Sequence, residues 1–180
     1  MSDCKIGPIF LDWSNLEWSN PPNLMTPPPV SQALTDMGIP HRVFRHSGPV
    51  KSLEQAAAER GQLPEQIVRS IVFRLSADEF VMALMAGPQQ IDWKALRRYL
   101  GEKRLTMASE EEVLRVTGYE RGAVAPFGLP QPLRILADET IFAFEEMSIG
   151  SGQRGTTIIL SRGDLRQALG DVEMVRLGEA

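Results

Sequence analysis

The twelve residues TGYERGAVAPFG, residues 117–128, join a predicted helix end to a constrained loop. Gly118 directly follows the helix-like segment, and a glycine in the left-handed conformation commonly ends a helix there. Gly122 and Gly128 bracket Pro126, so the loop combines free backbone rotation with one fixed φ angle. On local sequence alone we favour an ordinary helix-to-strand connection, and the alternative is one wall of a binding site.

The composition is that of an ordinary globular chain. Hydrophobic residues make up 43% and charged residues 23% of 180 residues, which fits one domain with a short appendage. The net charge of −4 gives no general attraction to nucleic acid or to an anionic membrane, so RNA contacts would depend on local basic patches. With one cysteine, Cys4, and two histidines, His41 and His46, a closed Cys/His zinc site is excluded by counting. We expect neither a metal nor a cofactor.

The chain carries no signal for a membrane or for secretion. Its longest apolar run, residues 80–86, is far shorter than the roughly 20 residues needed to cross a bilayer. Residues 1–10 lack the basic and then apolar segments of a secretion signal. We therefore expect a cytoplasmic protein without membrane contact.

The first 29 residues differ from the rest of the chain. Trp13 and Trp18 are followed by five prolines within residues 21–29, a density that opposes a helix or a central strand. We predict an N-terminal arm over residues 1–29 and a domain over residues 30–180. The arm either lays its tryptophans on the domain or a partner, or is a disordered leader.

The remaining residues predict an α+β domain with a mixed, barrel-like sheet and flanking helices, since strands outnumber helices and many links are short. Ser52, Asp92 and a capping box of Ser109 with Glu112 predict three helix starts. Further helices are expected near residues 30–37 and 164–169. Strands are expected at residues 41–45, 67–75, 80–86, 105–108, 133–137, 141–147, 156–161 and 172–177.

Two polar residues stand in informative places on the predicted strands. A period of two puts Arg69 on the more apolar face of the strand at 67–75, where a cation needs an anionic partner or an opening to solvent. It is either a structural ion pair or a ligand contact. His46, at a strand end, lines a pocket rim or, as we favour, lies on the surface.

The densest group of basic residues in the sequence also has two interpretations. Lys94, Arg97 and Arg98 occupy the polar face of the predicted helix that begins after Asp92, and Lys103 and Arg104 follow it. They form either a phosphate contact or a solvated helix face.

Several standard motifs fail. Residues 150–155, GSGQRG, match the G-x-G-x-x-G dinucleotide fingerprint, but the β-branched run that follows predicts a strand where the motif needs a helix. The sequence contains no G-x-S-x-G elbow, Walker loop or H-E-x-x-H motif. We therefore expect neither a Rossmann site nor a conventional catalytic triad.

Taken in order, five stretches resemble the YbaK/ProX family of aminoacyl-tRNA deacylases, which is related to the editing domain inserted in bacterial prolyl-tRNA synthetases. They are SLEQAA (52–57), QIVRSI (66–71), TGY leading to GAVAP (117–126), GSGQRG (150–155) and GDL (163–165). The resemblance extends over about residues 30–177 and leaves out the proline-rich arm.

The resemblance implies a compact, barrel-like domain that hydrolyses the ester joining a wrong amino acid to tRNA. It implies the aminoacyl-tRNA acceptor end as substrate and an aminoacyl-tRNA synthetase as a candidate partner. The catalytic set that it implies is Arg69, Gly122, Gly150 and Ser151, and the substrate-binding set is Ala123, Val124, Ala125, Pro126, Gly152, Thr157 and His46. The two glycine loops would supply backbone N–H groups to the developing oxyanion.

Two residues depart from the family pattern. Arg69 stands where the family usually has a lysine, and it cannot act as a general base because it stays protonated. Thr157 stands where some members have an aspartate. Three readings follow: an intact deacylase, a deacylase of altered specificity, or a non-catalytic module that binds tRNA or a synthetase. A small-molecule-binding domain is a further alternative, and the oligomeric state is not predicted.

Overall fold

The structure, a computed structural model, describes residues 26–178, and its strands form two sheets. The smaller sheet has the order β1-β7-β6 and is antiparallel throughout. Its strands are β1 (Arg42–Arg45), β6 (Glu146–Gly150) and β7 (Thr156–Ser161). The central strand, β7, thus starts at Thr156, where residues 150–155 end, and this confirms that a strand follows the false dinucleotide motif.

The larger sheet has five strands in the order β4-β2-β3-β5-β8. Its strands are β2 (Val68–Arg74), β3 (Phe80–Ala86), β4 (Thr106–Met107), β5 (Arg134–Ala137) and β8 (Glu173–Met174). β2 pairs antiparallel with β3 and β4, whereas β5 runs parallel to both β3 and β8. The sheet is therefore mixed, as predicted.

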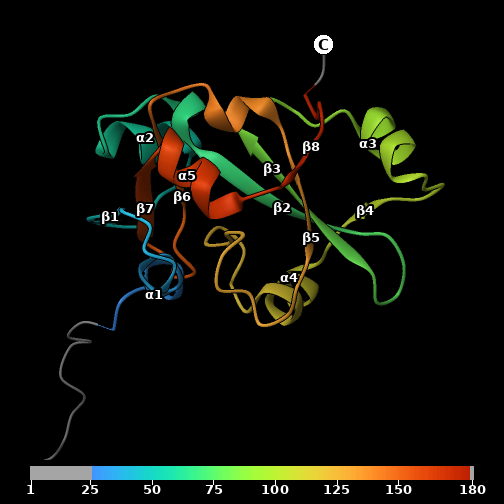
Figure 1. The fold of residues 1–180 in the computed structure, drawn as a ribbon, viewed down its shortest axis with the longest axis horizontal. Helices are drawn as coiled ribbons and strands as arrows, with labels where there is room; N and C mark the ends of the chain where they lie inside the picture. The colour runs from blue at the N-terminus through green and yellow to red at the C-terminus, as the bar shows by residue number, and fades with distance from the viewer. Residues whose placement is uncertain (1–25, 179–180) are drawn as a thin grey trace, which may run out of the picture.

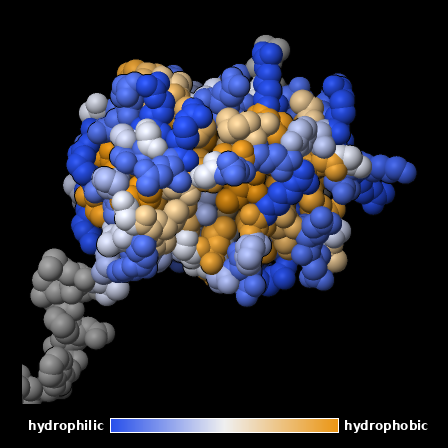
Figure 2. Space-filling model, in the orientation of Figure 1, coloured by the Kyte–Doolittle hydropathy of each residue, from blue (hydrophilic) through white to orange (hydrophobic). Residues whose placement is uncertain are grey.

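The two sheets meet along β2 and β6. A single parallel bridge between Ile67 and Ser148 joins them, and helices flank the strands (Figure 1). The predicted barrel-like α+β fold is confirmed, although the strands do not close into a complete barrel. On the face seen in Figure 2, hydrophilic residues dominate the periphery and hydrophobic residues reach the surface near the centre.

The α-helices begin and end largely where the sequence predicts. They are α1 (Pro29–Asp36), α2 (Leu53–Glu59), α3 (Trp93–Leu100), α4 (Glu110–Thr117) and α5 (Arg162–Leu169), and the 3-10 helices are η2 (Pro64–Gln66) and η3 (Glu139–Phe142). Ser52 and Asp92 accept hydrogen bonds from first-turn amides, and Ser109 with Glu112 forms the predicted capping box. Gly118 ends α4 with a φ of 75°.

The core has two parts because β3 is buried on both faces. Met82 and Leu84 pack into the larger cluster, whereas Val81 and Met85 pack into the smaller one. β2 also contributes to both: Val72 lies in the larger cluster and Phe73 in the smaller. The face of β2 that carries Arg69 is therefore not the single apolar face that the period of two suggested.

Two strand predictions near the C-terminus are corrected. The segment predicted as a strand over residues 141–147 starts as η3, because the Asp138 carboxylate accepts the amide of Thr140 and caps a 3-10 turn, and β6 begins at Glu146. The last predicted strand, residues 172–177, shrinks to Glu173–Met174. Asp138 contributes here too, since its second carboxylate oxygen accepts the amide of Leu177 at 2.6 Å.

The predicted N-terminal arm falls mostly outside the described residues, including Trp13 and Trp18, so its boundary stays a prediction. Within residues 26–178, no helix has the length and apolar character to cross a membrane.

Candidate functional site

A cleft of about 730 Å³ lies where the two sheets meet. Four stretches far apart in the sequence line it: the region before and along α2, the start of β2, the loop after α4, and the β6–β7 connection. Its volume is in the range of small-molecule and cofactor sites. The fold therefore places the predicted glycine loops and the predicted strand cation around one hollow.

The side chains that line this cleft carry positive charge only. Lys51, Arg60, Arg69 and Arg154 contribute to its lining, and no aspartate or glutamate does. Arg154 has a carboxylate partner, Glu120, at 4.0 Å, whereas the other three have none within 4.0 Å among residues 26–178. A protein with a net charge of −4 thus concentrates cations in a partly enclosed site, where the field attracts anions.

The two glycine loops touch through their backbones. A side-chain Cβ at Gly150 would lie 2.2 Å from the carbonyl oxygen of Val124 and 2.5 Å from that of Ala123. The amide of Gly152 donates a 2.8 Å hydrogen bond to the Ala123 carbonyl. Glycine is required at 150 because another backbone approaches closely, and not because of an unusual φ angle.

Tyr119 contacts both glycine loops, the loop after α4 and the β6–β7 connection. Its hydroxyl lies 2.8 Å and 2.9 Å from the carbonyl oxygens of Phe127 and Gly128 and can donate its single proton to either of them. A Cβ at Gly152, whose φ is 80°, would lie 2.7 Å from the Tyr119 ring. Burial raises the pKa of the Tyr119 phenol, which keeps it in the neutral form that donates.

Two loop residues that line the cleft have backbone amides without a hydrogen-bond acceptor among the described residues. Gly122, with a φ of 89°, and Val124 both contribute to the lining. Neither of their N–H groups donates a hydrogen bond to another residue within the part of the chain that the structure describes. Free amide donors beside a cationic cleft are suited to hold an oxygen that gains negative charge.

Arg69 occupies the β2 wall of the cleft. Its Nη2 donates to the backbone carbonyl of Gln89, and burial lowers the pKa of the guanidinium. The Nε of Arg69 and the hydroxyl of the adjacent Ser70 are buried without a hydrogen-bond partner among the described residues. Buried polar atoms normally have partners, so each of these two atoms, on residues that line the cleft, is a candidate for a hydrogen bond with a ligand or water.

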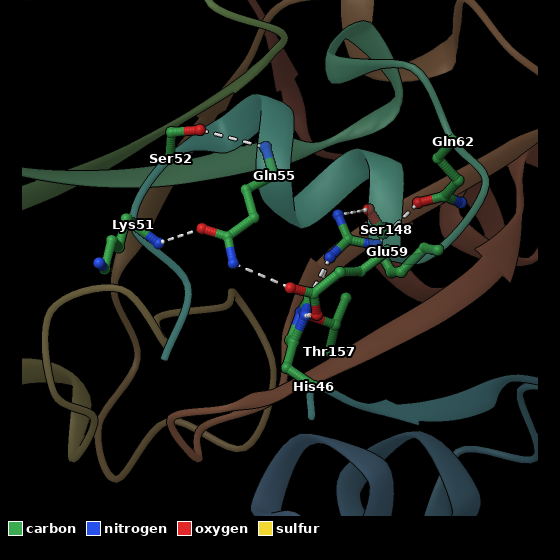
Figure 3. A network of polar contacts seen from close by, with 9 residues as sticks. His46, Lys51, Ser52, Gln55, Glu59, Gln62, Ser148 and Thr157 are labelled. Carbon is green, nitrogen blue, oxygen red and sulfur yellow. Dashed lines mark hydrogen bonds and ion pairs between the residues drawn. The ribbon is translucent and has the colours of Figure 1, made fainter. Parts of the chain in front are cut away.

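His46 is not the surface residue that we favoured. Its side chain is 4% exposed, with Nδ1 2.7 Å from a Glu59 carboxylate oxygen and Nε2 3.3 Å from the Thr157 hydroxyl (Figure 3). The prediction was wrong because Glu59 at the end of α2 and Thr157 in β7, which is 111 residues away in sequence, both contact the His46 ring. His46 lies at the cleft wall, as the alternative reading had it.

The other predicted site residues divide into two groups. Those that line the cleft are Arg69, Gly122, Val124, Gly150, Thr157 and His46; those that do not are Ala123, Ala125, Pro126, Ser151 and Gly152. The buried Ser151 hydroxyl lies 2.8 Å and 2.9 Å from the carbonyl oxygens of Gln153 and Thr156, and so it shapes the loop.

Sequence reasoning missed several residues of the cleft. It identified Arg69 as an inward-facing cation, whereas Arg60 also lines the cleft, together with Lys51 and Arg154. Arg60 follows α2 directly and carries no periodic signal, so only its tertiary contacts reveal it. The basic patch on α3 does not contribute to the cleft, and α3 lies at the opposite end of the molecule from α2 and β7 (Figure 1).

Metal ligands are a separate question. Among residues 26–178, the histidine, cysteine, aspartate and glutamate side chains form no group of three or more that could hold a metal ion.

The sequence profile of the aminoacyl-tRNA editing domain matches residues 47–168, a segment that contains all the residues lining the cleft except His46. This chain belongs to that family. The editing-domain family is the one that the five motifs indicated, and the resemblance is confirmed.

Curated relatives of this editing-domain chain include proline–tRNA ligases. The ligase of Kosmotoga olearia is 34% identical over 106 residues, which cover 59% of this chain and 18% of the ligase. The ligase of Streptococcus pneumoniae serotype 19F is 31% identical over 132 residues, which cover 72% of this chain and 21% of the ligase. The chain thus spans about a fifth of the length of these relatives.

Solved structures share the fold. A crystal structure described as that of a candidate trans-editing enzyme for prolyl tRNA synthetase has a TM-score of 0.76 and 27% identity, covering 84% of this chain and 96% of that one. A hypothetical protein with a TM-score of 0.74 and 22% identity covers 84% of this chain and 99% of its own, and that likeness concerns the fold alone.

Proposed function

We propose that this protein hydrolyses the ester bond of mischarged aminoacyl-tRNA, acting in trans as an editing deacylase. The observation that carries the proposal is a cationic cleft whose lining includes no aspartate or glutamate and includes two loop residues with unpaired amides, in a member of the editing-domain family. The cations suit the phosphates of a tRNA acceptor end, and the amides suit an ester carbonyl.

The proposed reaction is direct attack by water. The water oxygen bonds to the ester carbonyl carbon, and the carbonyl oxygen becomes an oxyanion that the amides of Gly122 and Val124 stabilise. The bond between the carbonyl carbon and the ribose oxygen then breaks. The ribose oxygen takes one proton of the attacking water and becomes a hydroxyl. The amino acid leaves as a carboxylate, and the other proton of the water goes to solvent. An aminoacyl ester is already activated, so orientation and electrostatic stabilisation are sufficient.

Arg69 is proposed to anchor the aminoacyl-adenosine end. A guanidinium offers a fork of donors to a phosphate or carbonyl oxygen but stays protonated, so it orients the substrate and does not remove a proton. The unpartnered Nε of Arg69, a residue that lines the cleft, supports this role.

The relatives suggest which substrate to test first. They are proline–tRNA ligases, and one structural neighbour is described as acting for prolyl tRNA synthetase. We propose tRNA for proline, charged with an amino acid other than proline, as the substrate, and the matching synthetase as a partner.

The test is a deacylation panel. Purified protein is incubated with tRNA for proline and control tRNAs, each charged with correct and incorrect amino acids, and release of the amino acid is followed. We expect hydrolysis of at least one mischarged species well above the buffer rate. A folded protein that releases none refutes the enzymatic proposal. Tight binding of charged tRNA without release would support a binding-only module, the reading that the departures at Arg69 and Thr157 favour.

A further inference from the structure

Arg60, at the C-terminal end of α2, is held entirely by neutral acceptors. Its Nε donates to Gln62 at 3.0 Å, its Nη1 to His46 Nε2 at 3.1 Å and to Thr157 at 3.5 Å, and its Nη2 to Ser148 at 3.2 Å. No carboxylate of the described residues lies within 4.0 Å of it. Burial lowers the pKa of Arg60, which shows that desolvation outweighs the nearby negative charge of Glu59.

The contact with His46 fixes the tautomer of the imidazole. An arginine N–H can only donate, so His46 Nε2 must accept and the ring proton must sit on Nδ1. Nδ1 then donates to the Glu59 carboxylate at 2.7 Å, and the other Glu59 oxygen accepts from Gln55 at 3.0 Å (Figure 3). The hydrogen bond from His46 is the main reason that the pKa of Glu59 is lowered.

In the hydrogen-bonded series Glu59–His46–Arg60, the carboxylate of Glu59 therefore binds the histidine, and the arginine has no counter-ion among the described residues. We call the neutral partners of Arg60 its neutral frame: Gln62, His46, Thr157 and Ser148. A half-buried cation in such a frame destabilises the fold unless an anion compensates its charge. The frame orients the guanidinium at the cleft, next to the hydroxyl of Thr157, where an anion can approach.

We infer that Arg60 is a second anchor for the substrate and that it binds a backbone phosphate of the single-stranded 3′ end of tRNA. His46 and Glu59 are its positioning residues. This inference rests on the proposed function in one respect, since it takes the cleft to be the seat of the acceptor end. It assigns a role to Arg60 that no motif in the sequence indicated.

The anchor is tested by binding and not by catalysis. The probe is a short, uncharged single-stranded RNA with the 3′ end of tRNA, titrated into the full-length protein at several salt concentrations. We expect Arg60→Gln to weaken binding about tenfold and to reduce the slope of log K against log salt by about 0.7, the value of one lost phosphate contact on a single strand. Arg60→Lys keeps the charge and should retain most of the slope.

The matched control is Arg134→Gln, which removes the same charge from an exposed arginine that already has a carboxylate partner, Glu173, at 2.7 Å. It should change neither the affinity nor the salt slope appreciably. If Arg60→Gln behaves like Arg134→Gln, the inference is wrong.

Glu59→Ala separates positioning from bulk charge. Removing a negative charge near a cationic cleft should strengthen RNA binding if charge alone matters. If Glu59 positions Arg60 through His46, binding should weaken several-fold instead. Should Glu59→Ala fail to fold, as judged by circular dichroism, the Arg60 series decides alone.

The inference and the proposed function can fail separately, because the RNA probe carries no ester. If the deacylation panel shows no hydrolysis while Arg60→Gln loses a salt-linked contact, the deacylase proposal fails and the anchor stands. If hydrolysis occurs and Arg60→Gln matches its control, the anchor fails and the deacylase proposal stands.

Discussion

Three arginines of the outer surface and two arginines of the cleft bind opposite kinds of partner. On the outside, Arg42, Arg74 and Arg134 each meet a carboxylate at 2.6 Å, 2.8 Å and 2.7 Å. In the cleft, Arg60 and Arg69 donate to neutral oxygens and nitrogens, and no carboxylate of the described residues lies within 4.0 Å of them. A carboxylate partner neutralises the charge of an arginine. A neutral partner orients the guanidinium but does not neutralise its charge, so the charge can still bind an anionic ligand.

This difference predicts how each class contributes to stability. Exposed ion pairs contribute about 0 to 1 kcal/mol, because water screens them. Cleft arginines bear a desolvation cost without a counter-ion, a common sign of sites where function is retained against stability. Substitutions of Arg60 and Arg69 should therefore affect activity far more than stability, and substitutions of the surface pairs should affect stability alone.

The largest expected effect is that of Arg69→Ala. Loss of one or two charge-assisted hydrogen bonds at about 1.5 to 3 kcal/mol each should lower kcat/KM on mischarged tRNA by more than about tenfold, down to undetectable turnover. The thermal unfolding midpoint should hardly move, and Arg69→Lys should retain part of the activity. A large drop in the midpoint of Arg69→Ala would show instead that this arginine is structural and would break the comparison.

The next effect concerns the cleft wall that the glycine loops form. Gly150→Ala places a Cβ 2.2 Å from the Val124 carbonyl oxygen, which forces the two loops apart. We expect the free energy of unfolding to fall by about 1 to 3 kcal/mol, as measured by chemical denaturation. Gly48→Ala is the matched control, since Gly48 also lines the cleft and a Cβ there would meet nothing within 4 Å. An equal fall in the free energy of unfolding in both variants would contradict the proposal that close backbone contact requires glycine at position 150.

The smallest effect belongs to a surface pair. Hydrogen bonds from Arg134 and then Tyr99 lower the pKa of Glu173 from 4.5 to about 2. A carboxyl with a lowered folded-state pKa contributes stability above pH 4.5 and loses it as the pH falls toward 2. The pair is 47% and 34% exposed, so we expect its contribution to stay below about 1 kcal/mol.

Arg134→Gln checks this prediction. The difference in unfolding free energy between wild type and variant should be constant above pH 4.5 and shrink as the pH falls toward 2. Deacylation should be unchanged. A difference that persists at pH 2 would mean that the arginine contributes through packing and not through its charge.

The sequence predicted what depends on neighbouring residues. Ser52, Asp92 and the Ser109–Glu112 capping box lie within three residues of the amides they bind, so their patterns identify α2, α3 and α4 directly. Gly118 follows the same logic as the end of α4. The glycine loops stood out because unusual composition is also a local property.

What the sequence could not predict depends on residues that are distant along the chain. His46 is buried by Glu59 and by Thr157, which follows it by 111 residues. Asp138 makes one contact of each kind: its cap on the amide of Thr140 is local, whereas its bond to the amide of Leu177 joins residues 39 positions apart. Neither local propensity nor hydrophobic period carries such information, and the same holds for the neutral frame around Arg60.

The first helix, α1, belongs to the smallest segment that we expect to fold as an editing module in another protein. The family match begins at residue 47, yet the amide of Val30 in α1 donates to the Ser151 carbonyl at 3.1 Å, and Leu34 is fully buried. β1 also lies before the match and pairs with β7. A piece cut at residue 47 would leave β7 as an open edge and release the second glycine loop. The unit of sequence similarity is thus smaller than the unit of folding, and grafts into other proteins must start ahead of Pro29.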